Sequence, residues 1–160
     1  YIKDSTIDNG AILKANTVIE DSNVGFGCTV GPFARLRGGT ELEDLSELGN
    51  FVEANRSKIG KATKAKHLTY LGDALLGAEV NIGAGTITCN HDGIGVNRTT
   101  IEEGAYIGSG CNLVAPLKVN ANSTIASGST ITEDVAGDTL TIARSRQVKI
   151  KNWKGPKSRK

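Results

Sequence analysis

Apolar side chains recur at every sixth position over most of this chain, and that spacing restricts the possible folds more than any other feature. The two long series are Ile12, Val18, Val24, Val30, Leu36, Leu42 and Leu48, and Ile101, Ile107, Leu113, Val119, Ile125 and Ile131. Shorter stretches between them carry Ile59, Ala65, Leu71, Leu76 and Ile82. A period of six fits neither the 3.6-residue repeat of an α-helix nor the simple alternation of a strand. It is typical of a hexapeptide-repeat β-helix, an all-β prism in which three hexapeptides make one coil, so we expect roughly eight or nine coils.

The spacing is interrupted in three places. The anchors are eleven positions apart across 48–59 and five apart across 71–76. Across 88–101 they are thirteen apart, and the segment 90–97 within that gap is rich in Asn, Asp and Gly, which favour turns. We expect this segment to be a loop that leaves the prism. In repeat proteins such insertions gather on the functional face.

Length and composition agree with one small domain. The chain has 160 residues and no apolar run of about 18 residues, so we expect no membrane span. No signal-peptide pattern is present, and the three cysteines Cys28, Cys89 and Cys111 show no CxxC spacing, which favours a reduced, cytoplasmic protein. Repeat-like sequence begins almost at Tyr1, which suggests a piece of a longer protein.

Charge is concentrated at the C-terminal end. We expect the β-helix to cover residues 1–135, and a C-terminal arm with a basic tail to cover 136–160. The basic residues from Arg144 onward are Arg144, Arg146, Lys149, Lys151, Lys154, Lys157, Arg159 and Lys160, and no acidic residue lies among them. Such an arm suits a phosphate-rich ligand, and the alternative is a solvated terminus. Nucleic-acid binding is disfavoured because only Trp153 lies among these charges.

Three segments could carry chemistry. His67 lies beside a break in the repeat with polar Thr69 and Tyr70 nearby, and a neutral imidazole can act as a general base, although a lone histidine is more often structural. Segment 81–90 is rich in Gly and small residues that let a ligand approach the backbone, or it simply forms coil corners. Arg37 follows the anchor Leu36, projects outward, and can grip a phosphate or remain solvated.

Five motifs occur in order at spacings that match a known family. They are 31–37 (GPFARLR), 49–53 (GNFVE), 67–73 (HLTYLGD), 81–90 (NIGAGTITCN) and 114–116 (VAP). Together they resemble the C-terminal acetyltransferase domain of bacterial bifunctional N-acetylglucosamine-1-phosphate uridyltransferase/glucosamine-1-phosphate acetyltransferases. The resemblance implies a left-handed prism assembled as a homotrimer, with active sites where subunits meet. It also implies an N-terminal uridyltransferase domain in the full-length protein, which is absent from this chain.

The resemblance implies a reaction and a set of site residues. Acetyl passes from acetyl-CoA to the amine of glucosamine 1-phosphate, giving N-acetylglucosamine 1-phosphate for UDP-N-acetylglucosamine synthesis, and no metal is expected. His67 is implied as the general base. The residues implied to bind the sugar phosphate occupy the positions of Arg37, Asn55, Tyr70 and Asn81. Those implied to contact acetyl-CoA are Ala84, Asn90, His91, Ser109, Ser127 and Arg144, with Ala84 and Ser127 acting through backbone.

Three positions depart from the family pattern. Asn55 and Val96 stand where the family has lysines of the sugar site, and His91 stands where it has a tyrosine. Each lost charge-assisted hydrogen bond is worth roughly 1.5–3 kcal/mol, and the candidates to compensate from neighbouring positions are Arg56 and Arg98. These departures leave open an acyltransferase that acts on a different amino sugar or nucleotide sugar, or a structural β-helix of low activity. A zinc hydratase on the same prism is disfavoured, since it needs about three imidazole ligands and the chain has two histidines.

Overall fold

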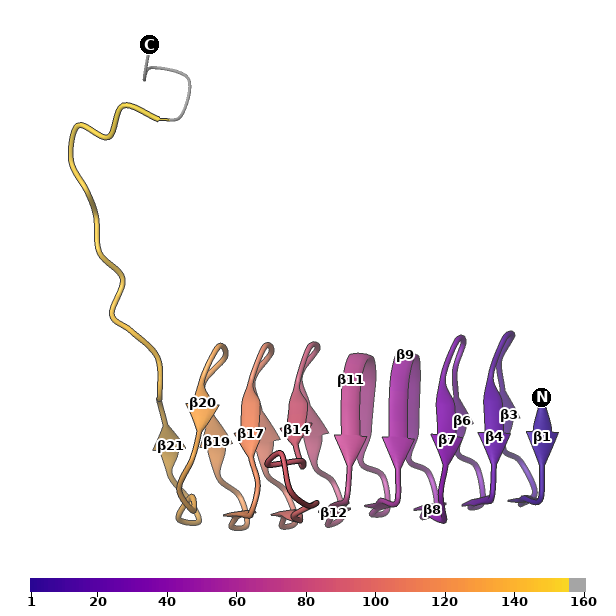
Figure 1. Cartoon of the computed structure of the whole chain (residues 1–160). Helices are drawn as coiled ribbons and strands as arrows, with labels where there is room; N and C mark the ends of the chain where they lie inside the picture. The colour runs from indigo at the N-terminus through magenta and orange to yellow at the C-terminus, as the bar shows by residue number, and fades with distance from the viewer. Residues whose placement is uncertain (156–160) are drawn as a thin grey trace.

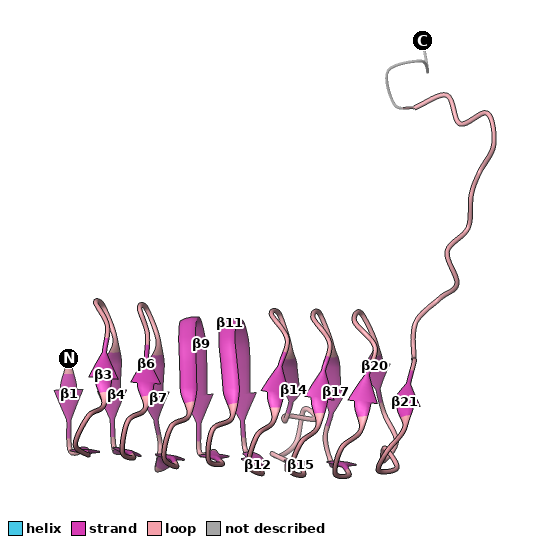
Figure 2. Cartoon of the chain, turned by 180° about the vertical axis from the view of Figure 1, so that it is seen from behind, coloured by secondary structure: helices cyan, strands magenta, loops and turns pink. Residues whose placement is uncertain are grey.

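The chain winds into a left-handed parallel β-helix of about eight coils, as a computed structural model that describes residues 1–155 shows (Figures 1 and 2). Lys157, Arg159 and Lys160 of the expected basic tail lie outside the described residues. The described part contains strands, turns and loops, and none of it forms a helix long and apolar enough to cross a membrane. The predicted fold class and coil number are therefore confirmed.

Short parallel strands stack into three flat faces. The first face contains β1 (Ile2–Lys3), β4 (Val18–Glu20), β7 (Arg35–Arg37), the second half of β9 (Glu47–Asn55), the second half of β11 (Lys64–Gly72), β14 (Ile87–Cys89), β17 (Asn112–Val114) and β20 (Thr130–Ile131). The second face contains β2 (Thr6–Ile7), β5 (Ser22–Val24), β8 (Thr40–Leu42), β10 (Lys58–Ile59), β12 (Ala74–Leu76), β15 (Thr99–Ile101) and β18 (Leu117–Val119). The third face contains β3 (Ile12–Leu13), β6 (Thr29–Val30), the first halves of β9 and β11, β13 (Asn81–Ile82), β16 (Tyr106–Ile107), β19 (Thr124–Ile125) and β21 (Leu140–Thr141).

The core is a stack of anchors inside the prism. The anchors from Val24 onward are buried, and even the weak anchor Thr88 is fully covered. Two expected anchors in the first coils are wrong: Ile12 is 58% exposed and Val18 is only half-buried, while Leu13 and Ile19 face the core instead. The first coils contain 17 residues rather than 18, since Ile2 pairs with Ile19 and Leu13 with Val30. The inward-facing residue therefore lies one position away from where a strict six-residue count places it.

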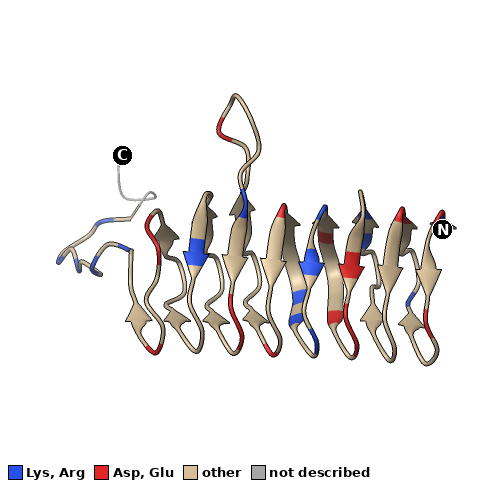
Figure 3. Cartoon of the chain, turned by 90° about the horizontal axis from the view of Figure 1, so that it is seen from below, with Lys and Arg blue, Asp and Glu red and all other residues tan. Residues whose placement is uncertain are grey.

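The expected loop is present. Leu76 pairs with Ile101 rather than with a residue 17 or 18 positions on, so this coil holds a long insertion. Figure 3 shows the insertion standing out from the prism. The stack continues past residue 135, the expected end of the prism, because β21 still pairs with β19. After β21 the chain runs away from the coils, as Figure 1 shows.

Candidate active site

His67 lies at a corner of the prism. Strand β11 crosses from the third face to the first face there, and the turn is made by Leu68, whose φ of 49° is left-handed. His67 is the last residue before this turn and pairs with Asn50 of β9. Its side chain is exposed and makes no hydrogen bond within residues 1–155. The imidazole is therefore available to accept a proton from a ligand at this corner.

A column of residues continues from His67 toward the C-terminal end. The register places Ala84, Ser109 and Ser127 at the position of His67 in the next three coils. Coils are spaced by about 4.8 Å, so the column is roughly 14 Å long. The backbone links it, since Gly110 N donates to Ala84 O at 2.8 Å. At its far end Arg144 Nη1 donates to Ser127 O at 2.6 Å.

This column has a smooth strip beside it. A Cβ placed on Gly83 would lie 2.5 Å from Ser109 N, and one on Gly108 would collide with Ser127 N, so both positions require glycine. The strip carries no side chain beside the column and ends beside a cation. These features fit a long, thin, negatively charged ligand such as CoA.

A second group of predicted site residues lies on the first face. Arg37 Nε donates to Glu53 Oε1 at 2.7 Å. Asn55 is paired in register with Arg37, is 2% exposed, and its Oδ1 has no hydrogen-bond partner within the described part of the chain. Tyr70 lies one coil further on, opposite Glu53. Arg37, Glu53 and Tyr70 make one polar surface on the first face, and Asn55 is buried beside them.

Asp73 organises the end of that surface. It accepts hydrogen bonds from Arg56 Nε and Nη2 at 2.8 and 2.9 Å and from Asn90 Nδ2 at 2.6 Å. The Arg56 guanidinium, followed by the Asn90 amide, holds the pKa of the Asp73 carboxyl below its usual value against the effect of burial. Sequence reasoning missed the roles of Asp73 and Glu53, although both lie within the quoted motifs.

One chain does not bring all the predicted residues together. Asn81 lies on the third face between Lys64 and Tyr106, around the corner from Arg37 and Tyr70. Asn90 ends the first face and so lies apart from the column of Ala84, Ser109 and Ser127. The predicted acceptor and acetyl-CoA residues are therefore each divided between two faces.

His91 belongs to the protruding loop. Its Nδ1 accepts the backbone N–H of Gly93 at 3.0 Å. Asp92 shapes the same loop by accepting the N–H groups of Gly95 and Ile94 and the side-chain amide of Asn97. These bonds, first that from Gly95, lower the pKa of Asp92 to about 2. His91 is thus held by its own loop, outside the column.

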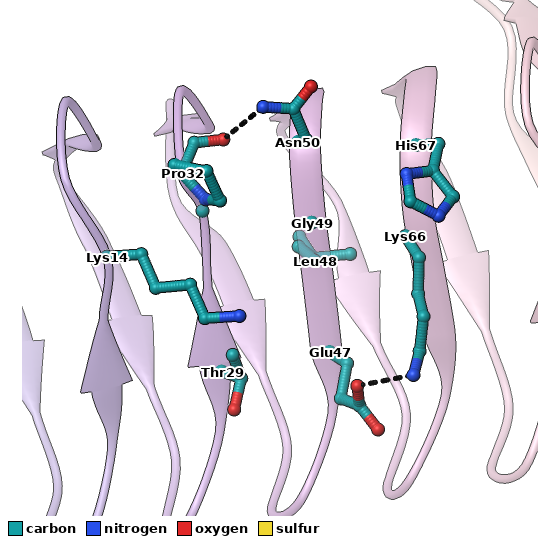
Figure 4. A pocket seen from close by; sticks show the side chains of 10 residues that line it. Lys14, Thr29, Pro32, Glu47, Leu48, Gly49, Asn50, Lys66 and His67 are labelled. Atoms are coloured by element: carbon teal, nitrogen blue, oxygen red, sulfur yellow. Dashed lines mark hydrogen bonds and ion pairs between the residues drawn. The ribbon is translucent and has the colours of Figure 1, made fainter.

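A pocket of about 190 Å³ opens beside His67 on the third face (Figure 4). Lys66 Nζ lies 2.9 Å from Glu47 Oε2 within it, and this ion pair lowers the pKa of Glu47. Across residues 1–155, no group of three or more His, Cys, Asp or Glu side chains is placed to hold a metal ion.

Comparison with known proteins gives long matches. The chain is 52% identical over 161 residues to the bifunctional protein GlmU of Methylococcus capsulatus, covering 100% of this chain and 35% of that protein. It is 53% identical over 148 residues to that of Idiomarina loihiensis, covering 92% of this chain and 32% of the relative. The chain thus spans about a third of the length of the curated relatives it matches. No family model matches it.

Solved structures share the fold at low sequence identity. LpxA, a UDP-N-acetylglucosamine acyltransferase from Bacteroides fragilis, has a TM-score of 0.71 at 17% identity, over 87% of this chain and 65% of that one. The UDP-N-acetylglucosamine acyltransferase from Campylobacter jejuni has a TM-score of 0.58 at 16% identity, over 85% and 68%. Because the curated relatives match along the whole chain, the resemblance seen in the sequence is confirmed: this chain corresponds to the C-terminal acetyltransferase region of bifunctional GlmU proteins.

Proposed function

We propose that this chain is an acetyl-CoA-dependent N-acetyltransferase whose acceptor is glucosamine 1-phosphate. The observation that carries the proposal is the column from His67 to Ser127, closed by Arg144, in a chain about 50% identical to GlmU proteins over its whole length. Acetyl-CoA lies along the column with its thioester at the His67 end and its phosphates toward Arg144. A solvated or structural histidine would not require this alignment.

His67 acts as the general base. It removes a proton from the acceptor's nitrogen, which then has a lone pair to attack the thioester carbonyl carbon. A carbon–nitrogen bond forms, the carbon–sulfur bond breaks, and CoA leaves as the thiolate, which takes up a proton. The exposed imidazole at the corner supports this role because it has no competing hydrogen bond within the described residues.

The active protein is a homotrimer, with each site completed by a neighbouring subunit. Two observations support this. The predicted residues divide between two faces of one prism, so a second copy must supply the other half. The corner between those faces also carries an apolar ridge of Phe33, Phe51 and Leu68, which are 49%, 55% and 60% exposed. The two phenylalanine rings are 5.3 Å apart, so the ridge is continuous and suits burial between subunits.

The rest of the full-length protein is part of the same proposal. The chain spans about a third of its curated relatives, which are named as bifunctional proteins. A uridyltransferase domain encoded before this chain would consume the acetylated product, and the expected cytoplasmic location suits both substrates.

Thiol release from acetyl-CoA tests the function directly. We expect turnover with glucosamine 1-phosphate, and His67→Ala should lower it by roughly 10²–10⁴-fold while the KM for acetyl-CoA stays similar. Turnover within threefold of the unmutated protein would remove His67 from the reaction. Light scattering at micromolar concentration should give the mass of three chains, and a monomer there would contradict the shared site.

A different amino sugar is the second candidate acceptor. Asn55 and Val96 favour it, because neither supplies the cation found at those positions in the resembled family. A panel of amino sugars and nucleotide sugars in the same assay separates the two acceptors by their kcat/KM values.

A further inference from the structure

One lateral row on the third face has seven members, and five of them are glycine or alanine. Each of its members directly follows a paired anchor, so the strand register aligns them across seven coils. In chain order the row is Lys14, Gly31, Gly49, Lys66, Gly83, Gly108 and Ala126. Lys14 begins the row, Lys66 interrupts its run of small residues, and two glycines separate the two lysines.

The two glycines, Gly31 and Gly49, both line the pocket drawn in Figure 4, where Gly49 is labelled, and together they are called its floor. A Cβ on Gly49 would collide with the carbonyl oxygen of Lys66, and one on Gly31 would collide with Thr17 Oγ1. The neighbouring backbone and side chain thus exclude any larger residue at these places. Lys14 and Lys66 are three coils apart, roughly 14 Å, and bound the floor at either end. Figure 4 shows the Lys14 side chain extended toward β9.

The pocket carries an excess of positive charge. Glu47 is its acid, and it already lies 2.9 Å from Lys66 Nζ and 3.6 Å from Lys64 Nζ. The Lys14 ammonium forms no ion pair or hydrogen bond within residues 1–155, whereas its backbone N–H donates to Val30 O. The residues that line the pocket therefore carry two ammonium groups, Lys14 and Lys66, against the one carboxylate of Glu47, which Lys64 also neutralises in part, and the pocket favours an anion.

The position of His67 gives this pocket a role. His67 directly follows Lys66 in the chain and lines the same pocket. On the C-terminal side of Lys66 the strip continues through Gly83 and Gly108 beside the column proposed for acetyl-CoA. Lys66 thus divides the strip into two parts, and His67 stands at the division, where donor and acceptor would meet.

We propose that Lys14 and Lys66 form an anion subsite for a phosphate monoester, which on the proposed function is the 1-phosphate of the acceptor. The floor of Gly31 and Gly49 admits the phosphate, and the amine of the same molecule reaches His67. The subsite supplies cations that Asn55 and Val96 do not. It also sets the specificity of this chain, because an amino sugar without a phosphate gains nothing from the two lysines.

The test compares Lys14→Gln, Lys66→Gln and the double variant with Lys3→Gln, another exposed lysine that lies outside the pocket. For glucosamine 1-phosphate we expect kcat/KM to fall about tenfold for each pocket lysine removed, because each contributes one charge-assisted contact. The kcat/KM of the Lys3→Gln control, the kcat/KM of every variant for glucosamine without a phosphate, and the KM for acetyl-CoA should stay within twofold of the unmutated values. Thermal unfolding of every variant checks that the fold is intact.

Calorimetric titration with inorganic phosphate, at constant ionic strength, separates this inference from the proposed function. Phosphate should bind the unmutated protein at least tenfold more tightly than the double variant. If no amino sugar is acetylated but this difference appears, the proposed function fails and the anion subsite stands. If glucosamine 1-phosphate is acetylated but the double variant changes neither its kcat/KM nor phosphate binding, the subsite is overturned and the function stands.

Discussion

Gly72→Ala tests whether Tyr70 and Asn90 act from the positions they now hold. The ring of Tyr70 lies across Gly72, so an added Cβ would be 2.5 Å from Tyr70 Oη and 2.7 Å from Tyr70 Cε1. The same Cβ would be 2.6 Å from Asn90 Nδ2. The φ of Gly72 lies outside the left-handed region, so alanine brings no backbone strain. The effect of the substitution must pass through these two side chains.

The expected loss of stability depends on which atoms must move to make room for the alanine Cβ. Both obstacles are ends of side chains, and Tyr70 is only half-buried, so it can swing outward. We expect a loss of stability of about 1 kcal/mol, the low end for overpacking, which lowers the Tm by about 2–4 °C. Each displaced neutral hydrogen-bonding group is worth about 1 kcal/mol, so kcat/KM for the acceptor should fall about fivefold through Tyr70, and the KM for acetyl-CoA should rise about fivefold through Asn90.

Two other glycines serve as controls, with Tm and kcat/KM measured for all three. A Cβ on Gly60 would be 2.7 Å from the backbone oxygen of Leu76, which cannot move aside, so Gly60→Ala should lower the Tm more than Gly72→Ala does. A Cβ on Gly95 meets nothing within 4 Å, so Gly95→Ala should change neither quantity. The reasoning is refuted if Gly72→Ala keeps its kcat/KM, or if its loss of Tm equals that of Gly60→Ala.

Three further predictions follow from burial, charge and pKa. Ile107 is fully buried, so Ile107→Asp should give no soluble folded protein on expression. Tyr106 next to it is 52% exposed, so Tyr106→Asp should fold. Equal yields of the two variants would contradict the buried stack. Arg144→Ala removes the hydrogen bond to Ser127 O, so it should raise the KM for acetyl-CoA about tenfold and make that KM less dependent on salt. Lys149→Ala should do neither. An unchanged KM in Arg144→Ala would exclude the arm from acetyl-CoA binding. The pKa of Asp92 is lowered from 3.8 to about 2, so its carboxylate stabilises the loop above pH 3.8 and that contribution is lost as the pH falls through about 2. An NMR titration of the Asp92 carboxyl carbon should therefore have its midpoint near 2, and a midpoint at 3.8 would show that the loop hydrogen bonds do not form in solution.

The repeat predicted the core well from Val24 onward, because each anchor's environment is set by the coils directly above and below it. It failed at Ile12, where a coil of 17 rather than 18 positions moves Leu13 to the inward side. A six-residue count cannot show where one position is lost between two anchors. The loop after Thr88 was predictable, because its turn-forming residues mark the interruption directly.

The sequence proposes residues for the candidate site but does not reveal how they are arranged. His67 and Tyr70 look like one motif because three positions separate them, yet the left-handed turn at Leu68 puts them on different faces of the prism. Conversely, His67, Ala84 and Ser109 are far apart in the chain and lie in one column because the coils stack in register.

Residues that are close in the sequence thus lie on different faces, while residues far apart in the sequence lie together, and this affects how subunits can assemble. A motif that turns a corner of the prism places some of its polar groups on one face and the rest on the next. Because both faces are flat, the two groups of side chains cannot meet within one subunit. An apolar ridge stands at the same corner, between the two half-sites. Burying that ridge against a neighbouring prism would bring a first face of one copy near a third face of another. The arrangement that covers the exposed phenylalanines is therefore also the one that can place Arg37 and Tyr70 of one subunit opposite Asn81 of the next.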